Sequence, residues 1–171
     1  MKELFDIFNI QKDWLKFAEA KNAALIAILG VFIRFYIAGL ESSVFYVKLY
    51  SLTALPIISI ALFVAVLSFI PKVDFQKITR ISFNKKTVDC NVIFFENISH
   101  MNVSEYRELL SKKLEATFNS FDLDVINQVY ANACIASRKY AMFRIAVVFT
   151  VLAIFTPLSG FILYFYIRAE K

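Results

Sequence analysis

The sequence contains little of what metal sites, disulfide frameworks and flexible linkers require. It has one histidine and two cysteines among 171 residues, and the cysteines, Cys90 and Cys134, are far apart without a CxxC spacing. We therefore expect no metal centre and no disulfide, and we predict that both thiols are reduced and buried. Three glycines and three prolines are too few for a long disordered linker.

Charge is also scarce. Charged residues make up 19% of the chain, whereas a soluble domain has about a quarter. Hydrophobic residues make up 59% and fall into three blocks, a distribution that is typical of integral membrane proteins. We predict an all-α membrane protein with three transmembrane helices and a small, mainly helical cytoplasmic insert between the second and third.

The first two apolar blocks are long enough to cross a bilayer. Residues 22–40, at about 1.5 Å per residue, cover roughly 28 Å. A connection at 41–49 leads to the second span at 50–70, which contains Pro56. Arg34 interrupts the first span, and its side chain either snorkels outward or is a pore-lining or inter-subunit charge.

The polar regions are predicted to be helical. Residues 3–21 have apolar side chains at helical spacing, so this amphipathic helix lies either at the membrane interface or against the protein's own cytoplasmic part. Asn102 and Glu105 form a capping-box pattern that predicts a helix from about 103 to 120. Asp122 or Asp124 is expected to cap the next helix.

That next helix meets no breaker before Pro157, so it is predicted to continue into the third span at 145–167. Pro157 and Gly160 can bend this span. The segment at 78–95 allows a short hairpin with a turn near Asn84.

Positive charge sets the orientation. Lysine and arginine are concentrated in residues 72–140 and near the N-terminus. The positive-inside rule therefore places both regions in the cytoplasm and the C-terminus outside. The predicted parts are an amphipathic cytoplasmic helix at 1–21, two spans at 22–71, a cytoplasmic helical region at 72–140, and a third span with a short external tail at 141–171.

No enzyme signature is present. The GxSxG, GxxxxGK[ST], HExxH and GxGxxG patterns do not occur, and His100 has no recognisable partner for nucleophilic catalysis. We therefore predict no catalytic residue, no cofactor and no metal. The polar region is also too small for the β-roll that binds cyclic nucleotides. A small ligand would have to be held by helices, by the loop around 89–100, or at a subunit interface.

Three segments carry motifs in a recognisable order. Residues 17–33 enter the first span through an acid, a lysine and small residues. Residues 91–110 have an asparagine, an aromatic pair, a short loop and a capped helix, and residues 124–147 form a helix that feeds the last span. The residues that carry these three motifs are Glu19, Lys21, Ala23, Ala24, Asn91, Phe94, Phe95, Ser104, Glu105, Tyr106, Gln128, Asn132, Ile135, Ala136, Lys139 and Tyr140.

In the order and spacing of these motifs the chain resembles the membrane-effector domain of Pycsar, the pyrimidine-cyclase antiphage system. The resemblance covers nearly the whole chain. One departure is Glu96, where the family usually has glycine.

The resemblance implies a function and its partners. In that family a phage-triggered cyclase makes cCMP or cUMP, and the effector senses it and damages the inner membrane, so that the infected cell stops growing before the phage matures. The resemblance therefore implies a multi-pass protein of the bacterial inner membrane that responds to a cyclic nucleotide made by a separate cyclase and binds no nucleic acid. Because three spans cannot enclose an aqueous pore, we also expect a homo-oligomer.

A cyclic mononucleotide needs a cation or backbone donors for its phosphate and an aromatic or apolar shelf for its base. Lys21, Arg138 and Lys139 lie near the predicted inner membrane surface. They are candidates for the phosphate, or else ordinary positive-inside anchors. Phe94 and Phe95 are candidates to stack the base, or else they plug a core.

The remaining candidates lie on helices. Asn132 is on a helix side rich in Ala and Ile, where a buried amide needs a partner in a ligand or in another helix. Arg34, Pro157 and Gly160 are candidates for pore formation or span packing, and the alternative for them is static packing of a monomer.

Two other functions are open from the sequence. One is a non-conducting membrane anchor or scaffold that recruits a cytoplasmic partner through residues 72–140. The other is a holin-like small pore-former. A gated effector is tolerated until its ligand appears, a scaffold never permeabilises the cell, and a holin-like protein is toxic when expressed alone.

Overall fold

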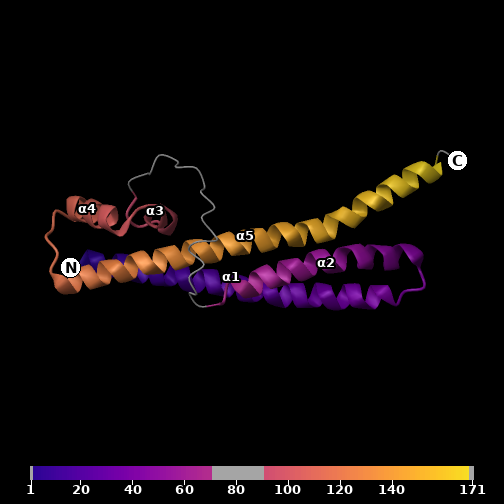
Figure 1. Cartoon of the computed structure of the whole chain (residues 1–171), viewed down its shortest axis with the longest axis horizontal. Helices are drawn as coiled ribbons and strands as arrows, with labels where there is room; N and C mark the ends of the chain where they lie inside the picture. Colours follow the sequence, from indigo (N-terminus) through magenta and orange to yellow (C-terminus); the bar gives the residue numbers. More distant parts are fainter. Residues whose placement is uncertain (1, 71–90, 170–171) are drawn as a thin grey trace. The chain divides into compact units, whose positions relative to one another are not determined.

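Helices connected by short turns make up the residues that the structure describes. A computed structural model describes the backbone of residues 2–70 and 91–169 and the side chains as far as residue 155. Within these ranges no strand occurs, which confirms the all-α part of the predicted fold class. The helices are α1 (Lys2–Leu40), α2 (Phe45–Leu67), α3 (Phe95–His100), α4 (Val103–Leu114) and α5 (Ser120–Ala169) (Figure 1).

The chain divides into two compact units. Unit 1 consists of Met1–Ala20 and Ile70–Tyr140, and unit 2 consists of Lys21–Phe69 and Ala141–Lys171. Two helices, α1 and α5, contribute residues to both units, because neither ends at the boundary.

Unit 1 has its own hydrophobic core. The N-terminal part of α1 contributes Leu4 and Ile7, which are buried with residues from α3, α4 and the first half of α5. The amphipathic segment at 3–21 was predicted to lie either at the membrane interface or against the protein's own polar part. Part of its apolar side packs in the core of unit 1, as in the second alternative, whereas Phe5 and Phe17 are exposed. The buried residues of this core that follow Ile7 are Val92, Phe95, Ile98, Met101, Tyr106, Leu110, Ile126, Val129, Ala133 and Ala136.

The capping box that begins α4 is confirmed. The backbone N–H of Asn102 donates to Oε2 of Glu105 at 2.9 Å, and both halves of the box are present. The helix ends at Leu114 and not near 120, as the sequence predicted. Glu115 has a left-handed φ of 47°, and the hydroxyl of Ser111 donates to the carbonyl of Ala116 at 2.8 Å, so the chain turns there.

The cap of α5 differs from the prediction that Asp122 or Asp124 would provide it. Asn119 is the cap: the N–H of Asp122 donates to Asn119 Oδ1 at 2.9 Å, and the N–H of Asn119 donates to Asp122 Oδ2 at 3.0 Å. Asp122 is therefore the third-position partner of a second capping box. The prediction that no break precedes Pro157 is confirmed, because α5 is continuous to Ala169.

Some sequence predictions lie wholly or partly outside the described residues. The hairpin at 78–95 is described only from 91 onward, where a turn leads into α3 at Phe95. The third span at 145–167 is helical in its backbone, and its crossing of a membrane stays a prediction.

Among the residues that the structure describes, two helices are long and apolar enough to cross a membrane. In α1 and α2 the most apolar 18-residue windows both have a mean hydropathy of 2.2, and only 17% and 28% of these windows are buried. The core helix of a soluble protein is mostly buried, so the exposure of these windows is compatible with lipid contact. The connection is shorter than the predicted 41–49, because α2 begins at Phe45 and Lys48 is an exposed helical residue.

Small side chains bring the helices of unit 2 together. On α2 the buried residues include Ala54, Ile58, Ala61 and Ala65, and they share a core with Leu25 and Leu29 of α1 and with Ala146 and Ala153 of α5. Small residues let helix backbones approach closely in an apolar environment. Arg34 is exposed on α1, so its side chain can extend away from this core.

Three of the hydroxyl groups described in unit 2 bond within their own helices, whereas the hydroxyl of Tyr50 on α2 donates to the carbonyl of Ile154 on α5 at 3.3 Å. Thr53 donates to the carbonyl of Leu49 at 3.1 Å, and Ser59 donates to that of Leu55 at 2.8 Å. On α5 Thr150 donates to Ala146 at 2.8 Å. These last three bonds satisfy their hydroxyls without a partner from another helix.

The hairpin of α1 and α2 has a close contact at Gly39. A methyl group at this position would lie 3.2 Å from Cβ of Ser51 and would also clash with its Oγ, and Ser51 is fully buried. A contact of this kind forces the neighbour to move. Gly30, on the same helix, has nothing within 4 Å of the corresponding position.

We expect Gly39→Ala to destabilise the protein by about 1–3 kcal/mol, because the added methyl group overpacks the contact with Ser51. Gly30→Ala is the matched control. It should stabilise the helix by about 0.5–1 kcal/mol, since alanine loses less backbone entropy than glycine. Thermal unfolding of the detergent-solubilised variants measures both. Equal melting temperatures for the two variants would contradict the close approach.

Candidate functional site

The side chain of Asn91 shapes the turn before α3. Oδ1 of Asn91 accepts the backbone N–H groups of Ile93 at 2.9 Å and Phe94 at 3.2 Å. An asparagine that bonds the backbone two and three residues ahead fixes a tight turn. This turn sets the orientation of the aromatic pair that follows it, Phe94 and Phe95.

Two buried side chains hold the same turn from other helices. The hydroxyl of Tyr106 on α4 donates to the carbonyl of Val92 at 3.1 Å. The side-chain amide of Gln11 on α1 donates to the carbonyl of Ile93. Both side chains are fully buried. Burial raises the pKa of Tyr106 above its usual range, so the hydroxyl stays protonated and remains a donor.

A second tyrosine ties α5 to the segment between α3 and α4. The hydroxyl of Tyr130 donates to the carbonyl of Met101 at 3.0 Å. Burial is the largest cause that raises the pKa of Tyr130, to about 12, with a smaller contribution from Cys134. Cys134 itself is reduced and half-buried, so its predicted full burial is not observed. Cys90 lies outside the described residues.

Four aromatic rings meet in unit 1, and we call Trp14, Phe94, Phe95 and Tyr140 the aromatic cluster. Phe95 stacks on Tyr140 with ring centroids 4.9 Å apart and planes 15° apart. Trp14 lies 5.4 Å from Phe95 and 6.3 Å from both Phe94 and Tyr140. Edge and offset contacts of this kind stabilise aromatic pairs beyond their burial.

The aromatic cluster contains Phe94 and Phe95, which were predicted either to stack on the base of a nucleotide or to plug a core. Phe95 is 7% exposed and belongs to the core of unit 1, so in this structure it fills the core, as the alternative interpretation held. Phe94 is half-buried at the edge of the same core. The ligand role of both residues stays a prediction, and Phe94 is the ring that a base could reach with less rearrangement.

An ion pair joins α1 and α5 near the aromatic cluster. Lys139 Nζ lies 3.0 Å from Oε1 of Glu19, and the side chains are 12% and 48% exposed, respectively. A lysine this deeply placed has lost most of its water and needs an anion close to its ammonium group. The predicted phosphate ligand Lys139 therefore already has a carboxylate partner.

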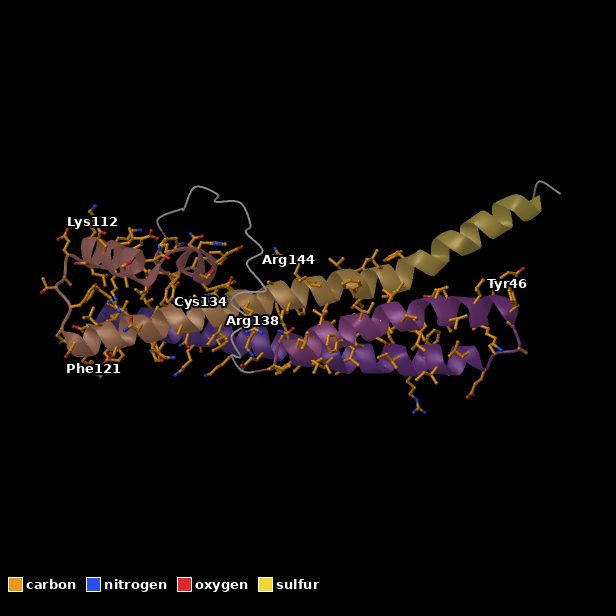
Figure 2. All side chains as sticks on the ribbon, in the orientation of Figure 1. Tyr46, Lys112, Phe121, Cys134, Arg138 and Arg144 are labelled. Carbon is orange, nitrogen blue, oxygen red and sulfur yellow. The ribbon has the colours of Figure 1, made fainter. Side chains whose placement is uncertain are left out.

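The other predicted ligand residues are placed as follows. Arg138 is half-buried on α5 in unit 1 (Figure 2). Lys21 belongs to unit 2, where its ammonium lies 5.7 Å from the ring centroid of Phe143. Its convergence with Lys139 on one pocket stays a prediction. Asn132 is buried, and its Oδ1 accepts from Gln128 Nε2 at 3.1 Å, one turn away on the same helix.

Two features of unit 1 that bear on ligand binding were not predicted from the sequence. One is the pairing of Glu19 with Lys139, and the other is a groove of about 820 Å³. Glu3 and Asp6 place carboxylates on its wall and Lys113 a single ammonium, so the lining does not favour an anionic ligand. The remaining lining residues are Ile7, Ile10, Asn91, Val92, Ile93 and Leu114. No cluster of metal-ligating side chains occurs in the part of the chain that the structure describes.

We expect Tyr106→Phe to destabilise unit 1 by about 1–3 kcal/mol, because the carbonyl of Val92 would keep its burial and lose its donor. Tyr130→Phe should cost less, since Tyr130 is half-buried and water can replace its hydroxyl. Melting followed by far-ultraviolet circular dichroism ranks the two variants. A larger loss for Tyr130→Phe would contradict this ordering.

Comparison with known proteins identifies the family. The model of the Pycsar effector protein domain matches residues 3–166 of the chain. Comparison with the curated proteins and with the solved structures finds no match. The matched range takes in the aromatic cluster, the Glu19–Lys139 ion pair and both helices that are apolar enough to cross a membrane. The chain therefore belongs to the Pycsar effector family and is an antiphage defence effector with a transmembrane domain.

Proposed function

We propose that the protein senses a cyclic pyrimidine mononucleotide, cCMP or cUMP, and responds by impairing the integrity of the inner membrane, which causes abortive infection. The observation that carries this proposal is the extent of the family match, from residue 3 to residue 166. One domain of the effector family thus includes both a polar helical unit and an apolar one.

The contacts of unit 1 support the binding of a nucleotide of this class. Such a ligand carries one negative charge on a phosphodiester and one flat base. The side chain of Lys139 is only 12% exposed, and a charge in such a position attracts an anion more strongly than a lysine in water does. Phe94 and Trp14 lie close by in sequence-distant elements of the same unit, and their rings can stack on a pyrimidine.

The apolar helices support the membrane part of the proposal. We propose that α1 and α2 cross the inner membrane together with the last part of α5, with unit 1 in the cytoplasm and the C-terminus outside. Three helices pack too closely to leave an aqueous channel between them, so we propose that several copies assemble before the membrane is damaged. No enzymatic step is needed for this response, because ligand binding alone can shift a conformational equilibrium.

Expression in bacteria beside an inducible pyrimidine cyclase tests the proposal. We expect membrane depolarisation and dye entry when the cyclase is active, and neither with a catalytically dead cyclase or with the effector alone. An intact membrane in the presence of confirmed cCMP and cUMP, with the effector inserted, would refute the proposed response and favour a scaffold. Depolarisation by the effector alone would favour a holin-like pore-former.

Lys139→Ala should reduce the response by about tenfold or more, because an ammonium contact to an anion contributes about 1.5–3 kcal/mol. Lys21→Ala tests the second predicted cation in the same assay. Lys16→Ala is the matched control, since Lys16 is a lysine of α1 whose side chain is 68% exposed. Equal responses of the Lys139→Ala and Lys16→Ala variants, at equal membrane insertion, would remove Lys139 from the proposed binding site.

A further inference from the structure

Two ion pairs that involve α1 differ in their surroundings. Asp13 and Lys16 lie 3.9 Å apart on the helix surface and are 75% and 68% exposed. Pairs of that kind contribute little, because water solvates both charges. Lys139 is only 12% exposed and lies 3.0 Å from Glu19. Its ammonium group cannot exchange Glu19 for bulk water without a cost, so it retains Glu19 until another anion replaces it.

The exposure of the pair is one-sided. Glu19 is 48% exposed, whereas its partner is nearly buried. If the pair separates, the carboxylate can return to water in place, while the ammonium group stays in a partly dry position. The lysine is therefore the fixed half of the contact and the glutamate is the half that can leave.

The pair also lies at a distinctive place in both helices. Glu19 comes one residue before Ala20, where α1 leaves unit 1, and Lys139 comes one residue before Tyr140, where α5 does so. Tyr140 is in contact with Trp14, which is on the same helix as Glu19. The ion pair and the ring contact together fasten α1 to α5 where each helix ends its part in unit 1.

We propose that Glu19 occupies the site of the ligand's phosphodiester on Lys139, so that the carboxylate and the cyclic nucleotide compete for one ammonium group. This inference rests on the proposed function and names the regulation of the same site. Both anions carry a single negative charge shared by two oxygens. Exchange of one for the other leaves no buried charge unpaired, and it releases α1 from α5 at the ion pair.

Competition of this kind makes the resting contact an autoinhibitory one. The nucleotide must be concentrated enough to displace Glu19, which keeps the effector silent at low ligand levels. The chain's single tryptophan, Trp14, lies against Tyr140. Its fluorescence is therefore expected to change when the ion pair opens, and it provides a readout that is independent of membrane damage.

The test uses the full-length protein in phosphatidylcholine nanodiscs, titrated with cUMP and with cCMP while Trp14 fluorescence is recorded. Glu19→Gln removes the competing charge and keeps the shape of the side chain, so affinity should rise about two- to fivefold. Lys139→Gln should lower affinity by about tenfold or more. Asp13→Asn is the matched control, because it removes an acid of α1 from the exposed pair, and its affinity should equal that of the unchanged protein.

A charge-swapped protein separates a structural role from a binding role. The double variant Glu19→Lys, Lys139→Glu can re-form the ion pair, so its melting temperature should lie closer to that of the unchanged protein than that of Lys139→Gln does. It presents a carboxylate where the phosphodiester should bind, and nucleotide binding should be lost. Retained binding by the swapped protein, or no gain in affinity for Glu19→Gln, would overturn the competition while leaving the proposed function intact. Absence of binding of both nucleotides to the unchanged protein would instead refute the proposed ligand and the competition with it.

Discussion

The contact between α1 and α5 inside unit 1 is the interaction on which the other features of that unit depend. Trp14 contacts both Phe95 and Tyr140, so one residue of α1 joins the first residue of α3 to α5. Large aromatic rings contribute more buried apolar area than any other side chains. The ring contacts fix the position of the segment at the start of α3, and the hydrogen bonds of Asn91 fix the direction of its backbone.

Local signals carried most of the correct predictions. A capping box is written within four residues, so the start of α4 at Asn102 was visible in the sequence, and the absence of breakers predicted an unbroken α5. The ends were harder. The cap at Asn119 was missed because an aspartate three residues later was taken as the cap itself, and the early end of α4 depends on the left-handed conformation of Glu115. A glutamate side chain does not predict a left-handed conformation.

The candidate site depends on contacts that no local pattern encodes. Lys139 was recognisable as a cation near the predicted membrane surface, but its partner Glu19 lies at the other end of the chain. The same holds for Gln11, whose amide meets the carbonyl of Ile93. Periodicity marks which side of a helix is apolar, and it cannot say which polar residue on that side will find a partner.

The bonding of three hydroxyls of unit 2 has a consequence for the entry of water. Thr53, Ser59 and Thr150 donate their hydroxyl protons to carbonyls of their own helices, so these protons are not available to water. A chain of water molecules needs hydrogen-bond donors and acceptors along its path. Each of these side chains would have to rotate away from its carbonyl before it could donate to such a chain. At these three positions, donation of the hydroxyl proton to water therefore requires a change of rotamer first.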